Sequence, residues 1–303
     1  MGFMIRDAFK RTALYRETRY LYRSQRVYGR LKDYIQQRYY IAHQIKKVTA
    51  PLDRPAAHQD YSIHVTCSHV DFDGMLWAVA SWHHVAPESG QVFIHEDGSL
   101  TAQDCALIER LFPHATLIRR AWADEQIAGW LADYPTTYRY RSDPKSFWGI
   151  KLVDPYFVAP CEKVFLFDSD VLWFQHPHTL LGKINHYRQP IFMDGRTVLE
   201  FPLTDGYVIT SKLNSGLFVY HKRHFDLAEV EQFFQKLPAG YWNDQPGYTY
   251  VLERPHGADY LDRDIYTLKG MYDPSMVVKH YVSPKREAFW FEGVKLLSPQ
   301  LLK

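Results

Sequence analysis

Two aspartates, Asp168 and Asp170, directly follow the apolar stretch Lys163–Phe167 (KVFLF), which is typical of a buried central strand. Two carboxylates this close to a core need a partner, because burying an unpaired charge is costly. At the end of a strand, where a sheet opens, they form a suitable site for a hard divalent cation. An isolated Asp-x-Asp is also a common solvated turn, so this pair alone leaves both interpretations open.

Three further polar motifs follow the aspartate pair along the chain. They are Asn214-Ser215-Gly216 in an apolar stretch, Asp244-Gln245 after Trp242-Asn243, and Lys279-His280-Tyr281 ahead of Lys285 and Arg286. The combination and order of these motifs, rather than any one of them, favour a functional site over a solvated turn.

The elements that must position these motifs alternate between strands and helices. Strands are expected at 62–67, 91–95, 115–119 and 163–167, and helices at about 74–84, up to 112 and at about 145–158. Thr101 and Asp104 form a weak capping box for the second helix. This alternation predicts an α/β fold with a mostly parallel sheet, whose ligands bind beyond the carboxyl ends of the strands.

The motif order resembles the GT-A nucleotide-sugar glycosyltransferases, especially those related to glycosyltransferase family 8. In that group an apolar strand runs into Asp-x-Asp, followed by an Asn-Ser-Gly strand, an Asp-Gln helix start and a late metal-binding histidine. The resemblance covers about residues 60–295. It implies a Rossmann-like, mostly parallel sheet flanked by helices. The C-terminal motif departs from the family pattern, since Ser283 replaces a glycine, Lys285 comes one place early and Trp290 lies further along.

The resemblance implies a metal site and a reaction. Asp170 and His280 would ligate a divalent ion, and Asp168 would ligate it or hold the nucleotide ribose; this ligand set suits Mn²⁺, with Mg²⁺ as the alternative. Lys285, and beside it Arg286, would stabilise the departing diphosphate. Asp244 would be the general base of an inverting enzyme, or would orient the acceptor in a retaining one, which analogy with family 8 favours.

The resemblance also implies donor and acceptor contacts. The expected donor-binding residues are Thr66, Cys67, Asp97, Lys151, Ser169, Asp194, Lys285 and Arg286. The expected acceptor-binding residues are Asn214, Ser215, Asp244, Gln245 and Trp290, with Asn214 also counted as catalytic together with Asp244 and Lys285. Structural alternatives stay open for three of them: a solvated lysine at 151, a helix N-cap at 244 and a core aromatic at 290.

The charge of the chain is unevenly distributed. The 303 residues carry a net charge of +2, but residues 1–50 hold 12 Lys and Arg against 3 Asp and Glu. We therefore predict two parts, a basic arm at 1–50 and a glycosyltransferase domain at 51–303. Leu14, Leu21, Tyr28 and Ile35 recur every seven residues, and five arginines between Arg16 and Arg30 gather on the other side of an amphipathic helix broken near Gly29.

Two roles for this arm remain open: its apolar side packs on the domain with solvated arginines, or it lies on an anionic membrane. Nucleic-acid binding is not expected, because the acidic remainder repels phosphate. No run of 18 apolar residues and no signal-peptide core are found, and three cysteines without a CxxC motif favour a reducing compartment. These features predict a cytoplasmic protein at the inner face of a membrane.

The sequence predicts a metal-dependent glycosyltransferase that uses a nucleotide-sugar donor, with UDP favoured, and a glycan or glycolipid acceptor. One alternative is a haloacid-dehalogenase-type phosphatase, in which Asp168 attacks phosphate and Asp170 serves as acid and base. That family opens its domain with this strand, whereas here three strands precede it. Another alternative is a non-catalytic, membrane-recruited module that binds sugar nucleotides.

Overall fold

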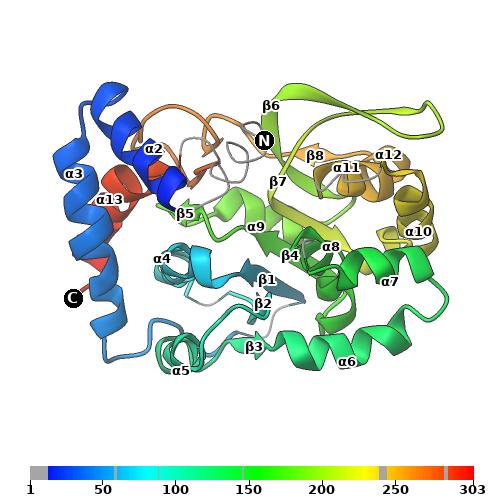
Figure 1. Ribbon diagram of the computed structural model, residues 1–303, viewed down its shortest axis with the longest axis horizontal. Helices are drawn as coiled ribbons and strands as arrows, with labels where there is room; N and C mark the ends of the chain where they lie inside the picture. The colour runs from blue at the N-terminus through cyan, green and yellow to red at the C-terminus, as the bar shows by residue number, and fades with distance from the viewer. Residues whose placement is uncertain (1–12, 58–59, 88, 145–146, 239–243, 283–285) are drawn as a thin grey trace, which may run out of the picture.

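The computed structural model describes residues 13–57, 60–87, 89–144, 147–238, 244–282 and 286–303. Its centre is a seven-stranded sheet with the order β3-β2-β1-β4-β7-β6-β8 (Figure 1). The strands are β1 (Tyr61–Cys67), β2 (Val92–Glu96), β3 (Thr116–Ile118), β4 (Lys163–Phe167), β6 (Ile191–Pro202), β7 (Val208–His221) and β8 (Asp259–Tyr260).

The half of the sheet formed by β1 to β4 is parallel, because helices return the chain between its strands. These helices are α4 (Phe72–Val85), α5 (Ala102–Leu111), α6 (Arg120–Trp130), α7 (Pro135–Ser142) and α8 (Phe147–Val158). The predicted α/β class is confirmed, and the observed boundaries of the predicted elements differ from the expected ones by at most two residues. The expected capping box at Thr101 and Asp104 is present.

The other half of the sheet departs from a parallel arrangement. β7 runs antiparallel to both β4 and β6, and its long hairpin with β6 arches away from the sheet (Figure 1). A second, three-stranded sheet joins β5 (Val171–Trp173), β10 (Val278–His280) and β9 (Tyr266–Thr267). β10 is antiparallel to β5 and pairs His280 with Val171, so a late segment of the chain lies against the residues that follow the Asp-x-Asp.

Helices cover both faces of the large sheet. α4, α5 and α9 (His178–Asn185) share one hydrophobic core with alternate residues of β1 and β4, such as Ile63 and Phe165. α6, α8, α10 (Leu227–Lys236) and α11 (Gln245–Tyr248) share a second core with the opposite residues, such as Val164 and Leu166. The alternation along β4 explains why the four residues that follow Lys163 in this strand are all apolar.

The N-terminal segment packs on the domain beside α13 (Lys295–Leu301) (Figure 1). α2 (Ala13–Arg26) ends near Gly29, whose φ of +64° lies in the left-handed region, and α3 (Leu31–Ile35) then begins a further helical stretch that reaches Lys47. The predicted break is confirmed. Tyr34 and Ile45 are buried in the first core, and the Trp77 indole donates to the Ala42 carbonyl at 3.1 Å. The domain boundary at residue 50 stays a prediction.

The arginines of α2 do not form a uniformly solvated face. Arg23 turns inward and pairs with the buried carboxylate of Glu287 at 2.6 Å, and Arg16 is half-buried, whereas Arg19 and Arg26 are exposed. Leu14 is exposed on the outer side of the helix. The alternative of a packed helix with solvated arginines therefore does not hold at Arg23, because the buried Glu287 carboxylate pairs with this side chain, nor at Arg16, which is half-buried. Within the described ranges, no helix is long and apolar enough to span a bilayer.

His83 in α4 gives the fold a measurable dependence on pH. Its ring is buried, stacks on Phe112 at 6.4 Å and lacks a hydrogen-bond partner for either nitrogen among the described residues. Burial, together with the nearby His114, lowers the pKa of His83 to about 4. In the unfolded chain this pKa returns to about 6.5, so the unfolded state binds more protons between these values. The stability that neutral His83 supports is thus lost as the pH falls from 6.5 towards 4.

We expect His83→Phe to reduce the pH dependence of stability. Between pH 7 and pH 5 the wild-type free energy of unfolding should fall by about 2 kcal/mol more than that of the variant, since each histidine contributes up to about 1.4 kcal/mol per pH unit. Urea unfolding at both pH values measures this difference. His84→Gln, at the exposed neighbouring position, is the control and should behave like the wild type. Equal pH dependence in wild type and His83→Phe would contradict the assignment.

Candidate metal and active site

Asp168, Asp170 and His280 come together at the carboxyl end of β4. One ligand atom of each lies within 4.8 Å of the others, and no further cluster of this kind occurs among the described residues. His280 Nε2 is 3.0 Å from Asp170 Oδ1 and 3.7 Å from Asp168 Oδ2. The backbone fixes this arrangement, because the Tyr281 amide donates to the Asp170 carbonyl at 2.9 Å, next to the β5–β10 pairing.

Asn214 sets the orientation of the His280 ring. Its Oδ1 accepts the Gly216 amide at 3.0 Å and lies 2.7 Å from His280 Nδ1. An amide oxygen can only accept, so His280 Nδ1 carries a proton, and Nε2 is the ring nitrogen that faces the two carboxylates. Histidines that bind metals are commonly held in this way by an outer acceptor.

Gly216 makes room for the same ring. A Cβ atom at this position would lie 2.0 Å from two ring atoms of His280, so no other residue fits without moving the histidine. A Cβ at Gly74 in α4 would similarly approach the Ser169 carbonyl oxygen to 2.9 Å. Ser169, a predicted donor contact, therefore packs closely under α4.

Lys151 is a buried cation that connects three elements. Its Nζ lies 2.7 Å from Asp168 Oδ1 and 2.8 Å from Asp244 Oδ2, and it donates to the Ser215 carbonyl at 2.7 Å. Burial opposes its charge, but Asp168 and Asp244 outweigh burial and raise the pKa of Lys151 above its ordinary value. The alternative of an ordinary solvated lysine is therefore wrong.

Asp244 does not cap the helix that it precedes. It occupies the N-cap position of α11, but its side chain makes no capping bond and instead accepts from Ser215 Oγ at 3.2 Å and pairs with Lys151. Gln245 opens α11, half-buried beside it. The described residues do not include four positions of the predicted motifs: Trp242, Asn243, Ser283 and Lys285.

Arg286 reaches the other side of the cluster. Its Nε lies 2.6 Å from Asp170 Oδ2, and its Nη1 lies 3.3 Å from Asp71 Oδ1. Burial alone would raise the pKa of Asp170, but the charges of Arg286 and His280 outweigh it and hold that pKa well below its ordinary value. Burial raises the pKa of Asp168, against the opposing effect of Lys151.

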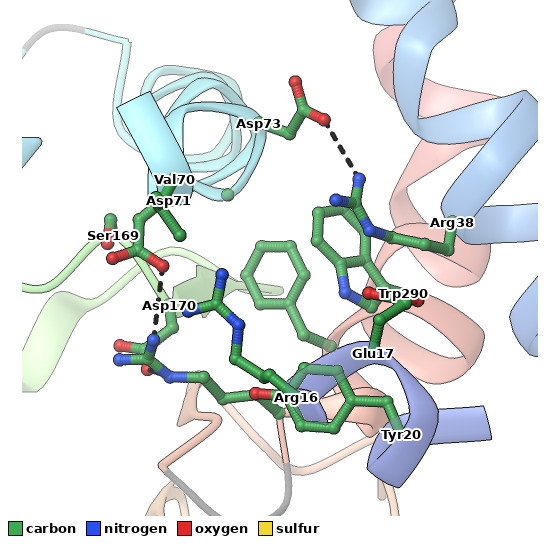
Figure 2. Close-up of a pocket in the computed structure, with 13 residues that line it drawn as sticks. Arg16, Glu17, Tyr20, Arg38, Val70, Asp71, Asp73, Ser169, Asp170 and Trp290 are labelled. Carbon is green, nitrogen blue, oxygen red and sulfur yellow. Dashed lines mark hydrogen bonds and ion pairs between the residues drawn. The ribbon is translucent and has the colours of Figure 1, made fainter. Parts of the chain in front are cut away.

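A pocket opens over Ser169 and Asp170, and its walls come from distant parts of the chain (Figure 2). α2 contributes Arg16, Glu17 and Tyr20, the following helical stretch contributes Arg38, and the C-terminal part contributes Arg286, Phe289 and Trp290. The Arg38 guanidinium lies 4.4 Å from the centre of the Trp290 ring. Sequence reasoning missed the pocket role of α2, although the seven-residue spacing of Arg16 and Arg23 was the signal that placed them on one face.

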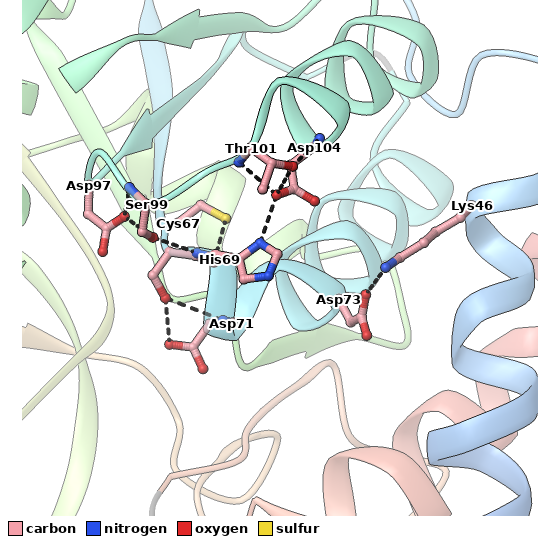
Figure 3. Close-up of polar contacts among 10 residues, drawn as sticks. Lys46, Cys67, His69, Asp71, Asp73, Asp97, Ser99, Thr101 and Asp104 are labelled. Atoms are coloured by element: carbon pink, nitrogen blue, oxygen red, sulfur yellow. Dashed lines mark hydrogen bonds and ion pairs between the residues drawn. The ribbon is translucent and has the colours of Figure 1, made fainter. Parts of the chain in front are cut away.

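The other predicted donor residues lie at the ends of their strands. Thr66 and Cys67 are buried at the end of β1, and Asp97 follows β2 and accepts from Ser99 (Figure 3). The neighbouring His69 lies with Nδ1 2.7 Å from Asp104 Oδ2, a contact that the sequence did not suggest.

Asp194 lies on β6 beside the Asn-Ser-Gly strand. It pairs in register with Leu213, accepts the Arg196 amide at 2.6 Å and lies 3.4 Å from Lys212 Nζ. Its carboxylate is therefore held within the β6–β7 hairpin.

Many solved structures are similar to this chain, among them the following two. One is the galactosyltransferase LgtC in complex with donor and acceptor sugar analogues, with 16% identity, a TM-score of 0.50 and coverage of 78% of this chain and 95% of that one. The other is mouse xyloside xylosyltransferase 1 in its apo form, with 11% identity, a TM-score of 0.52 and coverage of 75% and 99%. The chain has the GT-A fold. No protein-family model and no curated protein matches the GT-A chain.

The cluster suits a divalent metal ion. Two carboxylates and an imidazole whose Nδ1–H is already bound form a donor set that Mn²⁺ and Mg²⁺ accept, and the imidazole favours Mn²⁺. Asp170 pairs with Arg286 and Asp168 pairs with Lys151, and a metal ion can displace these cations or bind beside them.

We expect Asn214→Ala to weaken Mn²⁺ binding about 10- to 100-fold, because the His280 ring then loses the acceptor that orients it. Asn214→Asp keeps an acceptor oxygen for Nδ1–H and should bind Mn²⁺ within a few-fold of the wild type. Isothermal titration with Mn²⁺, with melting temperatures as a folding check, measures both. Wild-type affinity in Asn214→Ala would show that the orienting contact is unimportant.

Proposed function

We propose that the protein is a metal-dependent glycosyltransferase that transfers a sugar from a nucleoside diphosphate donor, with UDP favoured, to a glycan or glycolipid acceptor. The observation that carries the proposal is the Asp168–Asp170–His280 cluster at the carboxyl end of β4, where a GT-A sheet opens. This is the edge at which ligands of open α/β sheets bind.

In this proposal Asp168, Asp170 and His280 hold Mn²⁺ or Mg²⁺. When bound, the ion supplies Lewis-acid stabilisation of the negative charge that develops on the leaving diphosphate. Arg286 lies beside Asp170 and adds a positive charge on the same side. Lys285 is proposed for the same task.

Asp244 is better placed to orient than to accept a proton. One of its oxygens pairs with Lys151 and the other accepts from Ser215, so both are already occupied. We assign it the task of positioning the acceptor or stabilising the positive charge on the sugar ring, which agrees with retention of configuration. Ser215 and Gln245 flank it on the proposed acceptor side.

The donor is proposed to extend from the metal towards the ends of β1 and β2. Thr66, Cys67 and Asp97 line those strand ends and are assigned to the nucleotide. Ser169 adjoins the proposed diphosphate. Asp194, next to the Asn214 strand, is assigned to donor-sugar hydroxyls, and Trp290 to an acceptor sugar.

We expect Asp170→Ala to lower Mn²⁺-dependent hydrolysis of the UDP-sugar donor at least 100-fold, because it removes the more deeply buried of the two carboxylate ligands. Product analysis with a panel of UDP-sugars, with Mn²⁺ or with chelator, measures this loss. Asp133→Ala, at an exposed position in the loop after α6, is the control.

Unchanged hydrolysis in Asp170→Ala would refute the metal assignment. Absence of hydrolysis and transfer with every nucleotide sugar tested would favour the non-catalytic module. Phosphate release from a generic phosphomonoester would instead favour the phosphatase.

We also propose that the outer face of α2 contacts an anionic membrane, which places the protein at the inner membrane face. Leu14, Arg19, Tyr22 and Arg26 are exposed on this face and combine apolar, aromatic and cationic groups. The inner face of the same helix lines the pocket at Asp170, so a lipid-linked acceptor bound at the membrane lies near the proposed site.

We expect the double variant Arg19→Glu/Arg26→Glu to bind phosphatidylglycerol-containing vesicles at least 10-fold more weakly, since each cation near such a surface contributes about 1 kcal/mol. Co-sedimentation at low and high salt measures this. Arg139→Glu, exposed on α7, is the control and should reduce binding much less. Wild-type vesicle binding in the double variant would exclude this face as the contact.

A further inference from the structure

Three arginines line the Asp170 pocket, and among the described residues Arg16 is the one that forms no ion pair with a carboxylate. Of the other two arginines there, Arg38 pairs with Asp73 at 3.0 Å and Arg286 pairs with Asp170. For Arg16, no carboxylate lies within ion-pair distance in the described ranges. Its side chain extends from α2 into the pocket (Figure 2).

The adjacent carboxylate of Glu17 does not neutralise Arg16. Glu17 Oε1 accepts from the hydroxyl groups of Tyr34 at 2.5 Å and Tyr39 at 2.7 Å, which hold it on the side of the helix that meets α3. Arg16 is therefore a half-buried guanidinium, and such a group is well suited to binding an oxyanion because of its fixed array of donors.

The helix that carries Arg16 is fixed against the site. One turn further along α2, Tyr20 is 7% exposed and lines the same pocket. Burial raises the pKa of Tyr20, and the positive charges of Arg286 and Arg16 oppose this rise, so both guanidinium groups act on its hydroxyl. The Arg23–Glu287 pair anchors the next turn to the segment that follows Arg286.

We propose that Arg16 binds the diphosphate of the nucleoside diphosphate donor, so that the N-terminal helix completes the donor site. This inference rests on the proposed function, in which the diphosphate lies beside Asp170. A divalent cation at Asp170 competes with Arg286 for that carboxylate. The loaded pocket then presents Arg16 and a freed Arg286 to the phosphates, together with the charge of the ion. The glycosyltransferase site thus extends into a segment that lies outside the family resemblance.

The experiment measures nucleotide binding to the full chain by isothermal titration with Mn²⁺ present. UDP, GDP and ADP are tested on the wild type, and the tightest of them is then titrated into Arg16→Gln, Arg16→Lys and Arg19→Gln. Arg19→Gln makes the same change at an exposed position on the same helix. Mn²⁺ affinity without nucleotide and melting temperature are recorded for each variant.

We expect Arg16→Gln to weaken binding of the nucleoside diphosphate about 10- to 100-fold, the effect of losing a hydrogen bond between charged groups. Arg16→Lys keeps the charge and should lie between Arg16→Gln and the wild type. Arg19→Gln should match the wild type, and Mn²⁺ affinity without nucleotide should stay within about two-fold in all three variants.

The outcomes separate this inference from the proposed function. If the wild type binds no nucleoside diphosphate, both are overturned. If the wild type binds one and Arg16→Gln binds it equally well, only the role of Arg16 is overturned. A third outcome is that Arg16→Gln also loses Mn²⁺ affinity or melts at a much lower temperature, and that Arg16→Lys does not recover nucleotide binding. Arg16 then has a structural role, and the inference is likewise overturned.

Discussion

The buried ammonium group of Lys151 is the interaction on which the rest of the candidate site depends. It contacts Asp168 after β4, Ser215 on β7 and Asp244 before α11, and it is itself carried by α8. Each of these charges would be costly to bury alone, and removing one partner would leave the others uncompensated. One side chain therefore ties four segments of the chain together and fixes where both aspartates lie.

Other carboxylates around the candidate site are also compensated by nearby cations. Asp170 lies between His280 and Arg286, and Asp71 shares Arg286. Asp73 is paired by Lys46 and Arg38 from the N-terminal segment. The acidic domain and the basic segment are therefore complementary at this edge of the sheet, which accounts for the uneven charge of the chain. Positive charge reaches the site from both ends of the sequence.

Local patterns were sufficient to predict the first half of the sheet and several site residues. Lys163–Phe167 was predicted to be a central strand because the consecutive apolar residues after Lys163 require cover on both faces, and Asp168 and Asp170 were predicted from their place at its end. His280 was predicted only through the resemblance. Lys151 was placed on the correct helix, but its burial depends on two carboxylates far away in the sequence.

The features that were missed all depend on long-range contacts. The second sheet pairs β5 with β10, which are separated by about a third of the chain, and both strands are too short for a periodic signal. The α2 pattern showed which residues share a face but not that Glu287 would draw Arg23 inward. Helical periodicity gives relative positions on one element, whereas the partner that buries a face is set by tertiary packing.

The contact between the N-terminal helices and the last described elements has a consequence for synthesis of the chain on the ribosome. α2 and α3 pack against residues 286–301, with Arg23 on Glu287 and Asp33 on Lys295, so these contacts cannot form until residues 286–301 have emerged. His280 arrives at the same late stage. Until then the nascent chain carries an undocked basic helix next to an incomplete acidic domain. Assembly of the site and burial of the inner face of that helix mark the same late event in folding.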